Sequence, residues 1–149
     1  RKNEENFEKT SVKSSKDLYN YIRPTLDDLP HEEFWIILLS RANKIIGKQL
    51  IGRGGIAETS VDSKLIFKHA LEKLASAIIL CHNHPSGNLK PSNSDLQLTK
   101  KITEAGKLLD IQVLDHVIIG DNNYYSFADS GIIWSKKTIR FNEWLLQII

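Results

Sequence analysis

The sequence predicts an α/β domain in which a mixed β-sheet is flanked by helices. Short apolar runs bounded by turn residues alternate along the chain with longer segments whose apolar residues recur at helical spacing. The chain has 149 residues, of which 41% are hydrophobic and 26% are charged, and this length suffices to bury one substantial core. We therefore expect a single compact domain with appendages.

Residues 1–30 are predicted to form an N-terminal arm, a short helix and a linker. The arm is polar and rich in charge. Ser14 or Ser15 is placed to cap a helix over residues 16–23, and Pro24 should end that helix because a proline interrupts helical hydrogen bonding. We expect residues 24–30 to be a linker that contains the main domain boundary.

The main domain is predicted to span residues 31–135 and to begin with a hairpin. Residues 31–39 lead into the first core strand, and residues 44–51 form the next one. The four residues between them, 40–43, have the composition of a turn. The two strands should therefore pair in antiparallel fashion.

Two helices should follow, with a buried strand between them. Asp62 or Ser60 is placed to cap the first helix, which we expect to end at about Ser76. The second helix should run over 92–109, and the uncharged run 77–81 is typical of a buried strand. Helical spacing predicts inward stripes made of Leu65, Ile66, Ala70, Leu71 and Leu74 in the first helix, and of Leu98, Ile102, Ala105 and Leu109 in the second.

The end of the chain is predicted to add two strands and a tail. Residues 112–119 form a clear strand pattern, and residues 124–127 should return along it after a turn. The tail, residues 136–149, is apolar on several faces and is expected to be a helix. It would dock on this domain or on a second copy of the chain, which would make a homodimer.

Composition limits the compartment and the partners. The net charge is only +2, so nothing in the residues present supports nucleic-acid binding. The single cysteine, Cys81, lies in an apolar strand and cannot form an intramolecular disulfide, which favours a cytoplasmic location. We find no signal peptide and no apolar run long enough for a membrane span. Because the chain begins with Arg1 and contains no methionine, we expect it to be a piece of a longer protein.

The most informative stretch contains His82, His84 and Asp95. Residues two apart on an extended segment project to the same side, so both imidazoles can face one ion, and Pro85 keeps His84 out of helical geometry. Ser92 stands at the expected helix N-cap, which puts Asp95 in the first turn. Two imidazoles and one carboxylate form a zinc-like ligand set that leaves a fourth position for water. The alternative is structural, because Ser-x-x-Asp is also a common capping pattern without any metal.

These residues also carry a family resemblance. The stretch His82-Asn83-His84-Pro85-Ser86-Gly87, continued by Pro91-Ser92 and Asp95 and followed by Thr99 and by Asp115-His116, resembles the bacterial RadC family of the JAB/MPN superfamily, with its JAMM metalloprotease motif. The similarity runs from about Ser14 to Gly131. It implies a JAB/MPN-like fold, related to the cytidine-deaminase fold, with a mixed sheet flanked by helices in a single domain.

The resemblance assigns roles to the matching residues. It implies that His82, His84 and Asp95 bind one Zn²⁺ with a water as fourth ligand, that Glu33 is the general base, and that Ser92 helps to hold the developing oxyanion. Glu32, the neighbour of Glu33, is the rival base. The two side chains point to opposite faces of a strand, so only one of them can serve. For Ser92, a helix cap is the simpler role.

Asp115 and His116 alternate on a predicted strand, so at most one of them can face this site. Either one is a candidate partner for a ligand histidine, and a purely structural hydrogen bond is the alternative.

Two classes of function follow from the resemblance. The first is a zinc-dependent metallopeptidase or isopeptidase that acts on an unidentified peptide or protein substrate. The second is a non-catalytic accessory module in DNA repair or recombination, in which the metal is structural or regulatory. Retention of all three ligands and of a candidate base favours the hydrolase.

Overall fold

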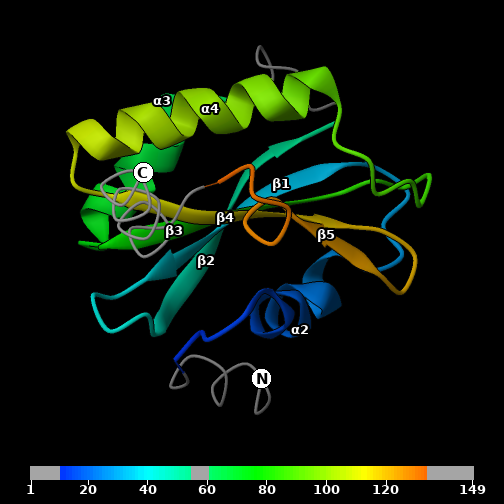
Figure 1. The fold of residues 1–149 in the computed structure, drawn as a ribbon, viewed down its shortest axis with the longest axis horizontal. Helices are drawn as coiled ribbons and strands as arrows, with labels where there is room; N and C mark the ends of the chain where they lie inside the picture. The colour runs from blue at the N-terminus through cyan, green and yellow to red at the C-terminus, as the bar shows by residue number, and fades with distance from the viewer. Residues whose placement is uncertain (1–10, 55–60, 134–149) are drawn as a thin grey trace, which may run out of the picture.

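The computed structural model describes residues 11–54 and 61–133. Figure 1 shows the arrangement of the helices and strands along the chain. In chain order the elements are α2 (Ser15–Leu26), β1 (Glu33–Leu39), β2 (Ile45–Arg53), α3 (Ser63–Glu72), β3 (Ala77–Asn83), α4 (Asn93–Leu108), β4 (Gln112–Ile119) and β5 (Tyr124–Ser126).

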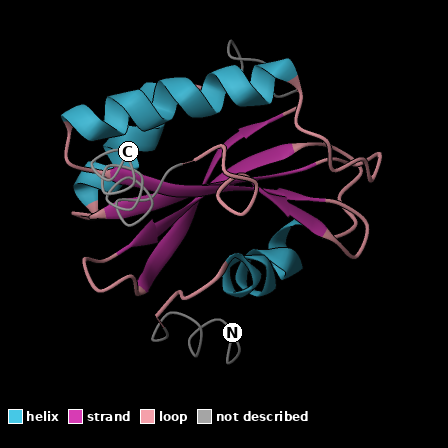
Figure 2. Cartoon of the chain, in the orientation of Figure 1, coloured by secondary structure: helices cyan, strands magenta, loops and turns pink. Residues whose placement is uncertain are grey.

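In the described part of the chain the strands form one five-stranded sheet of order β2-β1-β3-β4-β5 (Figure 2). β1 pairs in antiparallel fashion with both β2 and β3, while β3 and β4 are parallel and β5 returns antiparallel to β4. The parallel pair requires a crossover connection, which α4 provides. The predicted mixed sheet and the predicted hairpin are both confirmed.

Helices cover both faces of the sheet, as Figure 1 shows. α3 and α4 lie on one face, where they pack on Phe34, Ile36 and Leu80. α2 lies on the other face, over Ile37, Ile79 and Cys81. Successive residues of a strand point to opposite faces, so β1 and β3 contribute alternately to the two cores. The described residues thus form a single domain with three helices around the sheet.

α2 is longer than the sequence predicts. It runs to Leu26 with Pro24 inside it, and its last turn is closed by the Asp27 N–H, which donates to the Arg23 carbonyl at 2.8 Å. The predicted helix end at Pro24 is therefore wrong, and the segment predicted as a linker begins as helix. The physical reason is packing, because Ile22 and Leu26 are buried against the sheet, and this burial outweighs the loss of one backbone hydrogen bond.

α3 is shorter than predicted, and its inward stripe is different. Ile66 and Ala70 are buried as expected, but Phe67 is buried as well, while Leu65 and Leu71 are exposed. The helix ends in a Schellman motif in which the Ala75 N–H donates to the Ala70 carbonyl at 2.9 Å.

The residue that turns the chain out of this helix is Leu74. Its φ is 50°, and its side chain is 85% exposed rather than inward. A leucine in the left-handed region is unusual, because most helices that end in this way use glycine there.

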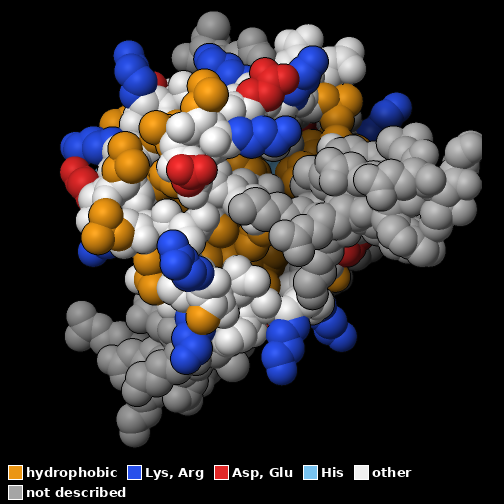
Figure 3. Space-filling view, turned by 60° about the vertical axis from the view of Figure 1, so that its left-hand side comes forward, with side chains coloured by type: hydrophobic (Ala, Val, Ile, Leu, Met, Phe, Trp, Pro, Cys, Tyr) orange, Lys and Arg blue, Asp and Glu red, His pale blue; other side chains and the backbone are white. Residues whose placement is uncertain are grey.

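α4 begins as predicted, with Ser92 as its N-cap, and buries Leu98 and Ile102. Leu109 is the C-cap and is 44% exposed, so its predicted inward position is wrong. The ends of α3 and α4 come forward in Figure 3, where hydrophobic side chains lie exposed among scattered Lys and Arg side chains.

Two predictions concern segments that the structure does not describe. The N-terminal arm up to residue 10 and the helical tail 136–149, with the homodimer it would make, lie outside the described residues. Within the described part of the chain, every helix is too short or too polar to traverse a lipid bilayer.

Gly106 supplies a test of the packing at the end of α4. A Cβ atom at this position would stand 2.3 Å from the Ile111 carbonyl oxygen, which the helix-ending turn folds over the last turn of α4. Gly106→Ala should therefore lower the free energy of unfolding by about 1–3 kcal/mol, although alanine is the better helix former. Urea denaturation measures the change.

Gly47 in β2 is the matched control, because a Cβ there would meet no atom within 4 Å. Gly47→Ala should change the stability by no more than about 0.5 kcal/mol. Equal effects of the two substitutions would contradict the proposed clash.

Candidate metal centre

Two histidines, His82 and His84, lie at the end of the central strand β3. The apolar sequence of β3 is buried along its whole length, and His82, near its end, pairs with Phe34 of β1 and Ile118 of β4. His84 follows directly, and its N–H donates to the Ile119 carbonyl at 2.9 Å. Both imidazoles are thus fixed at the edge where β3 enters the loop to α4.

The carboxylate of Asp95 is placed by the N-terminus of α4. The Asp95 N–H donates to Ser92 Oγ at 3.0 Å, and the Ser92 N–H donates to Asp95 Oδ2 at 2.8 Å. This reciprocal pair is a capping box. The box turns the carboxylate back toward β3, where its two oxygens lie 3.4 Å from His82 Nε2 and 3.4 Å from His84 Nε2.

These three side chains form a group that could bind a metal ion. Their candidate ligand atoms all lie within 4.8 Å of one another, and the two Nε2 atoms are 2.9 Å apart. Ligand atoms about 2.0–2.2 Å from a tetrahedrally coordinated ion are roughly 3.3–3.5 Å from each other. The two nitrogen-to-oxygen distances of 3.4 Å fit this geometry.

The burial and the charges of His82, His84 and Asp95 favour the protonation states that bind a cation. Burial raises the pKa of Asp95, but the neighbouring imidazoles of His82 and His84 and the hydrogen bond from the Ser92 N–H outweigh it and hold that pKa well below its usual range. Burial lowers the pKa of His82, whereas the neighbouring Asp95 carboxylate raises the pKa of the less buried His84. A charged carboxylate beside a neutral imidazole is the combination that a metal ion requires.

The outer nitrogens of both imidazoles are also held. His84 Nδ1 donates to the Asn88 carbonyl at 2.5 Å, which leaves its Nε2 free of a proton in the neutral ring. His82 Nδ1 lies 2.7 Å from His116 Nε2. Of the two candidates from the sequence, His116 is therefore the residue that contacts a ligand histidine. Asn88 was not identified from the sequence, because a main-chain acceptor leaves no signature there.

A cavity of about 320 Å³ opens beside the group. It is lined by Glu32, His84, Ser86, Asn88, Lys90, Ser92 and Asp95. The lining is polar and includes side chains of both charges.

Comparison with known proteins identifies the family. The family model described as the RadC-like JAB domain matches residues 12–132. This chain belongs to that family. The resemblance to RadC predicted from the His82–Asp95 stretch is thus confirmed.

Curated relatives of this RadC-like JAB domain carry the name UPF0758 protein. The one from Flavobacterium johnsoniae is 53% identical over 121 residues, which cover 81% of this chain and 53% of the relative. The one from Porphyromonas gingivalis is 49% identical over 124 residues, covering 83% of this chain and 55% of the relative. The chain thus spans about half the length of these relatives.

Glu33, the base implied by the resemblance, does not line the cavity of this RadC-like JAB domain. It lies on the α2 face of the sheet, as Trp35 does, and it is 6% exposed. Its carboxylate accepts hydrogen bonds from His31 Nε2 at 3.0 Å, Trp35 Nε1 at 3.1 Å and Arg53 Nε at 3.1 Å. Burial raises the pKa of Glu33, but these three partners lower it below its usual value.

Glu32 occupies the position predicted for Glu33. It lines the cavity together with His84, Ser92 and Asp95, and its negative charge favours the protonated forms of His82 and His84, although burial still lowers the pKa of His82 overall. Side chains alternate along a strand, so only one of the two glutamates can face the cavity. In the structure that residue is Glu32 and not Glu33. The structure thus places Glu32 beside the candidate ligands and Glu33 away from them, while the identity of the general base stays a prediction.

Ser92 lies in the cavity wall and caps α4 at the same time. As a cap it accepts the Asp95 N–H through an oxygen lone pair. Its hydroxyl hydrogen is not used by that bond. The cap and a donor role in the cavity are therefore compatible, although the sequence suggested a competition between them.

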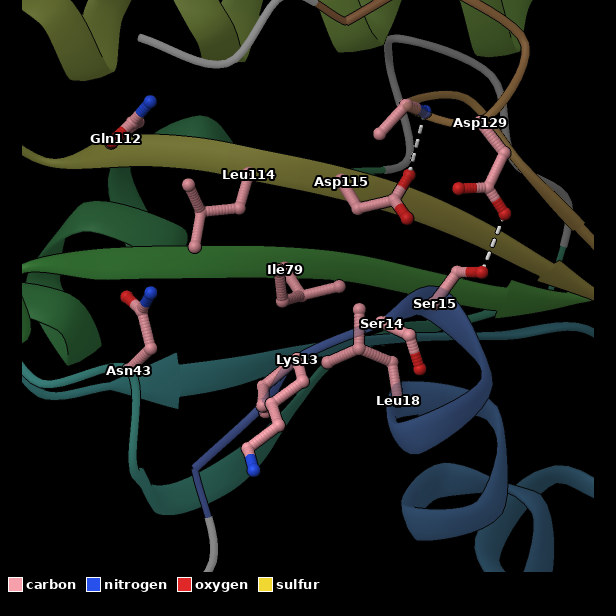
Figure 4. A pocket seen from close by; sticks show the side chains of 12 residues that line it. Lys13, Ser14, Ser15, Leu18, Asn43, Ile79, Gln112, Leu114, Asp115 and Asp129 are labelled. Carbon is pink, nitrogen blue, oxygen red and sulfur yellow. Dashed lines mark hydrogen bonds between the residues drawn. The ribbon is translucent and has the colours of Figure 1, made fainter. Parts of the chain in front are cut away.

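Asp115 points to the opposite face of the sheet from His116. There it lines a second cavity, of about 430 Å³, between β4 and the start of α2, where Figure 4 shows it near Asp129 and Ser15. Its carboxylate accepts hydrogen bonds from Ser126 Oγ at 2.6 Å and from the Ala128 N–H at 2.9 Å. Asp115 also accepts the His116 N–H at 2.7 Å, and no contact is found between its carboxylate and the imidazoles of His82 and His84 among the described residues, so its role in this cavity wall is structural.

The titration of Asp115 should be visible in the stability of the domain. Burial raises the pKa of Asp115 from 3.8 to about 6, against its hydrogen bonds. The folded state then binds a proton at a higher pH than the unfolded chain does, so this group stabilises the fold as the pH falls from 7 to 4, by roughly 2 kcal/mol. Denaturation of the wild type and of Asp115→Asn across this range measures the contribution as the difference between the two curves.

Parallel curves for the two proteins would contradict this expectation. They would mean that the hydrogen bonds from Ser126 and Ala128 keep the carboxylate charged in spite of its burial.

Proposed function

We propose that this RadC-like JAB domain is a zinc-dependent metallopeptidase or isopeptidase that hydrolyses an amide bond in a peptide or protein substrate. The observation that carries the proposal is that His82, His84 and Asp95 form a possible metal-binding group and that His84 and Asp95 line a cavity whose wall also contains the carboxylate of Glu32. Three protein ligands with an open side are typical of catalytic zinc sites, whereas structural sites are closed by four.

The donor set favours zinc among the common metal ions. Two imidazole nitrogens and one carboxylate oxygen are ligands that zinc accepts in tetrahedral geometry. Zinc bound here would polarise the amide carbonyl and lower the pKa of a bound water to about 7, so that hydroxide is supplied at neutral pH. The remaining steps fall to side chains of the chain itself.

Glu32 is the proposed general base. In the described part of the chain its carboxylate has no hydrogen bond or ion pair, in contrast to that of Glu33, which has three partners. A base must be free to accept a proton and must lie within hydrogen-bond reach of the attacking water. Glu32 would take that proton and later give it to the leaving amine.

Ser92 is the proposed donor to the developing oxyanion. Its hydroxyl oxygen is fixed by the Asp95 N–H at 3.0 Å, so its hydrogen can be directed into the cavity. A preorganised donor of this kind stabilises negative charge that develops only in the transition state. The capping bond thus also serves to orient the hydroxyl group.

Elemental analysis tests the metal directly. Protein prepared with zinc supplied should contain about one zinc per chain, and the double variant His82→Ala, His84→Ala should contain none, because two of three ligands are lost. His69→Ala is the control, since His69 lies on α3 beside Glu72 and away from the cavity. A wild type that stays free of metal would contradict the proposed zinc hydrolase and would mean that the three residues serve only as scaffold.

Substitution of the two neighbouring glutamates tests the base. Glu32→Gln should reduce kcat by about 10²–10⁴-fold, the usual contribution of a general base, on a fluorogenic library of peptides and isopeptides. Glu33→Gln should retain most of the activity, because its carboxylate lies on the other face of the sheet. Both variants should keep the zinc content of the wild type.

If Glu33→Gln lost activity and Glu32→Gln retained it, Glu33 and not Glu32 would be the general base. If the zinc-loaded wild type cleaves no member of the library, the hydrolase proposal fails and the non-catalytic alternative takes its place.

A further inference from the structure

A chain of buried hydrogen bonds connects the main chain of Asp95 to the imidazole of His82. Thr99 Oγ1 donates to the Asp95 carbonyl at 2.6 Å, and the same oxygen lies 2.6 Å from His116 Nδ1. On its other side, His116 Nε2 lies 2.7 Å from His82 Nδ1. Thr99 is 2% exposed, and both histidines are fully buried.

The hydroxyl group of Thr99 determines the direction of every bond in this chain. A hydroxyl has one hydrogen, and the Asp95 carbonyl oxygen can only accept it. Thr99 Oγ1 must therefore accept from His116, so the proton of the neutral His116 ring lies on Nδ1. His116 Nε2 is then an acceptor, and His82 must donate to it from Nδ1. In a neutral His82 ring this leaves Nε2 without a proton.

The packing around His116 prevents an alternative arrangement. Its ring stacks on Phe127 with centroids 4.5 Å apart, and it meets the edge of Phe34 at 5.7 Å. A ring held between two aromatic side chains cannot rotate without opening a void. The interior position also excludes the water that would otherwise satisfy either tautomer.

We propose that Thr99 and His116 are positioning residues that fix His82 in the tautomer with a proton on Nδ1, so that Nε2 presents its lone pair to the metal before any metal is bound. The inference rests on the proposed metal-binding function of His82. His82 Nε2 faces Asp95 Oδ1 at 3.4 Å, so the chain that starts at the Asp95 carbonyl ends opposite the Asp95 carboxylate. Asp95 thereby fixes the orientation of the His82 ring through its main-chain carbonyl and also supplies the carboxylate that faces this ring.

Nuclear magnetic resonance of the metal-free, full-length chain with ¹⁵N-labelled histidine tests the tautomer without any enzymatic activity. We expect the His82 ring to show a protonated Nδ1 and an unprotonated Nε2 in long-range proton–nitrogen spectra. In Thr99→Val, which keeps the shape of the side chain and removes the hydroxyl, the His82 signals should shift toward a mixture of tautomers. Zinc affinity, measured by competition with a chelator, should fall about 10–100-fold.

Thr103→Val is the matched control. Thr103 Oγ1 donates to the Thr99 carbonyl at 2.7 Å, one turn further along the same helix, so this variant loses the same kind of helix bond without touching a histidine. It should leave the His82 tautomer and the zinc affinity unchanged. His116→Phe is a second variant that removes the acceptor while retaining an aromatic ring, and it should repeat the loss seen in Thr99→Val.

Two results would overturn the inference. One is a proton on His82 Nε2 in the metal-free wild type, and the other is a Thr99→Val variant that matches Thr103→Val in tautomer and in zinc affinity. Failure of the proposed hydrolysis gives a different pattern, in which the tautomer and zinc affinity respond as expected but no peptide or isopeptide is cleaved.

Discussion

The hydrogen bond from the Ser92 N–H to the Asp95 carboxylate holds the beginning of α4 and the metal centre together. This 2.8 Å bond satisfies a donor that a helix N-terminus would leave without a partner, and it turns the carboxylate toward His82 and His84. The same residue offers its carbonyl to Thr99. The position of Asp95 therefore depends on the helix cap, and the orientation of His82 depends on the position of Asp95.

Burial has opposite consequences for the members of this group. His82 and His116 have no access to solvent, which lowers the pKa of each and favours neutral rings. Asp95 is nearly as buried, yet its hydrogen bonds keep it charged. An unpaired buried carboxylate is costly, so the group is arranged around a negative charge that a cation would neutralise. This electrostatic arrangement agrees with the ligand geometry, because both follow from the same three side chains.

The alternation of side chains at the start of β1 places Glu33 on the face opposite to Phe34, while its neighbour Glu32 lines the cavity. Phe34 and His82 have stacked rings 6.0 Å apart on the α4 face, whereas Glu33 joins Trp35 and Arg53 on the other side. A shift of one residue in the sheet register would exchange these faces. The register of β1 against β3 is consequently as important for the proposed chemistry as the identity of the ligands.

The sequence by itself determined the fold class and the three candidate ligands, because these follow from local patterns. Apolar runs and helical stripes predict the order of strands and helices, and His82, His84 and Asp95 are brought together by one strand, one turn and one helix cap that are close in sequence. The tertiary structure decided what depends on distant partners. Arg53 holds Glu33 away from the cavity, packing on the sheet extends α2 past Pro24, and Thr99 meets His116 only because α4 crosses over β4. None of these contacts leaves a periodic or spaced signature, since each joins side chains whose separation is set by the packing of the whole sheet.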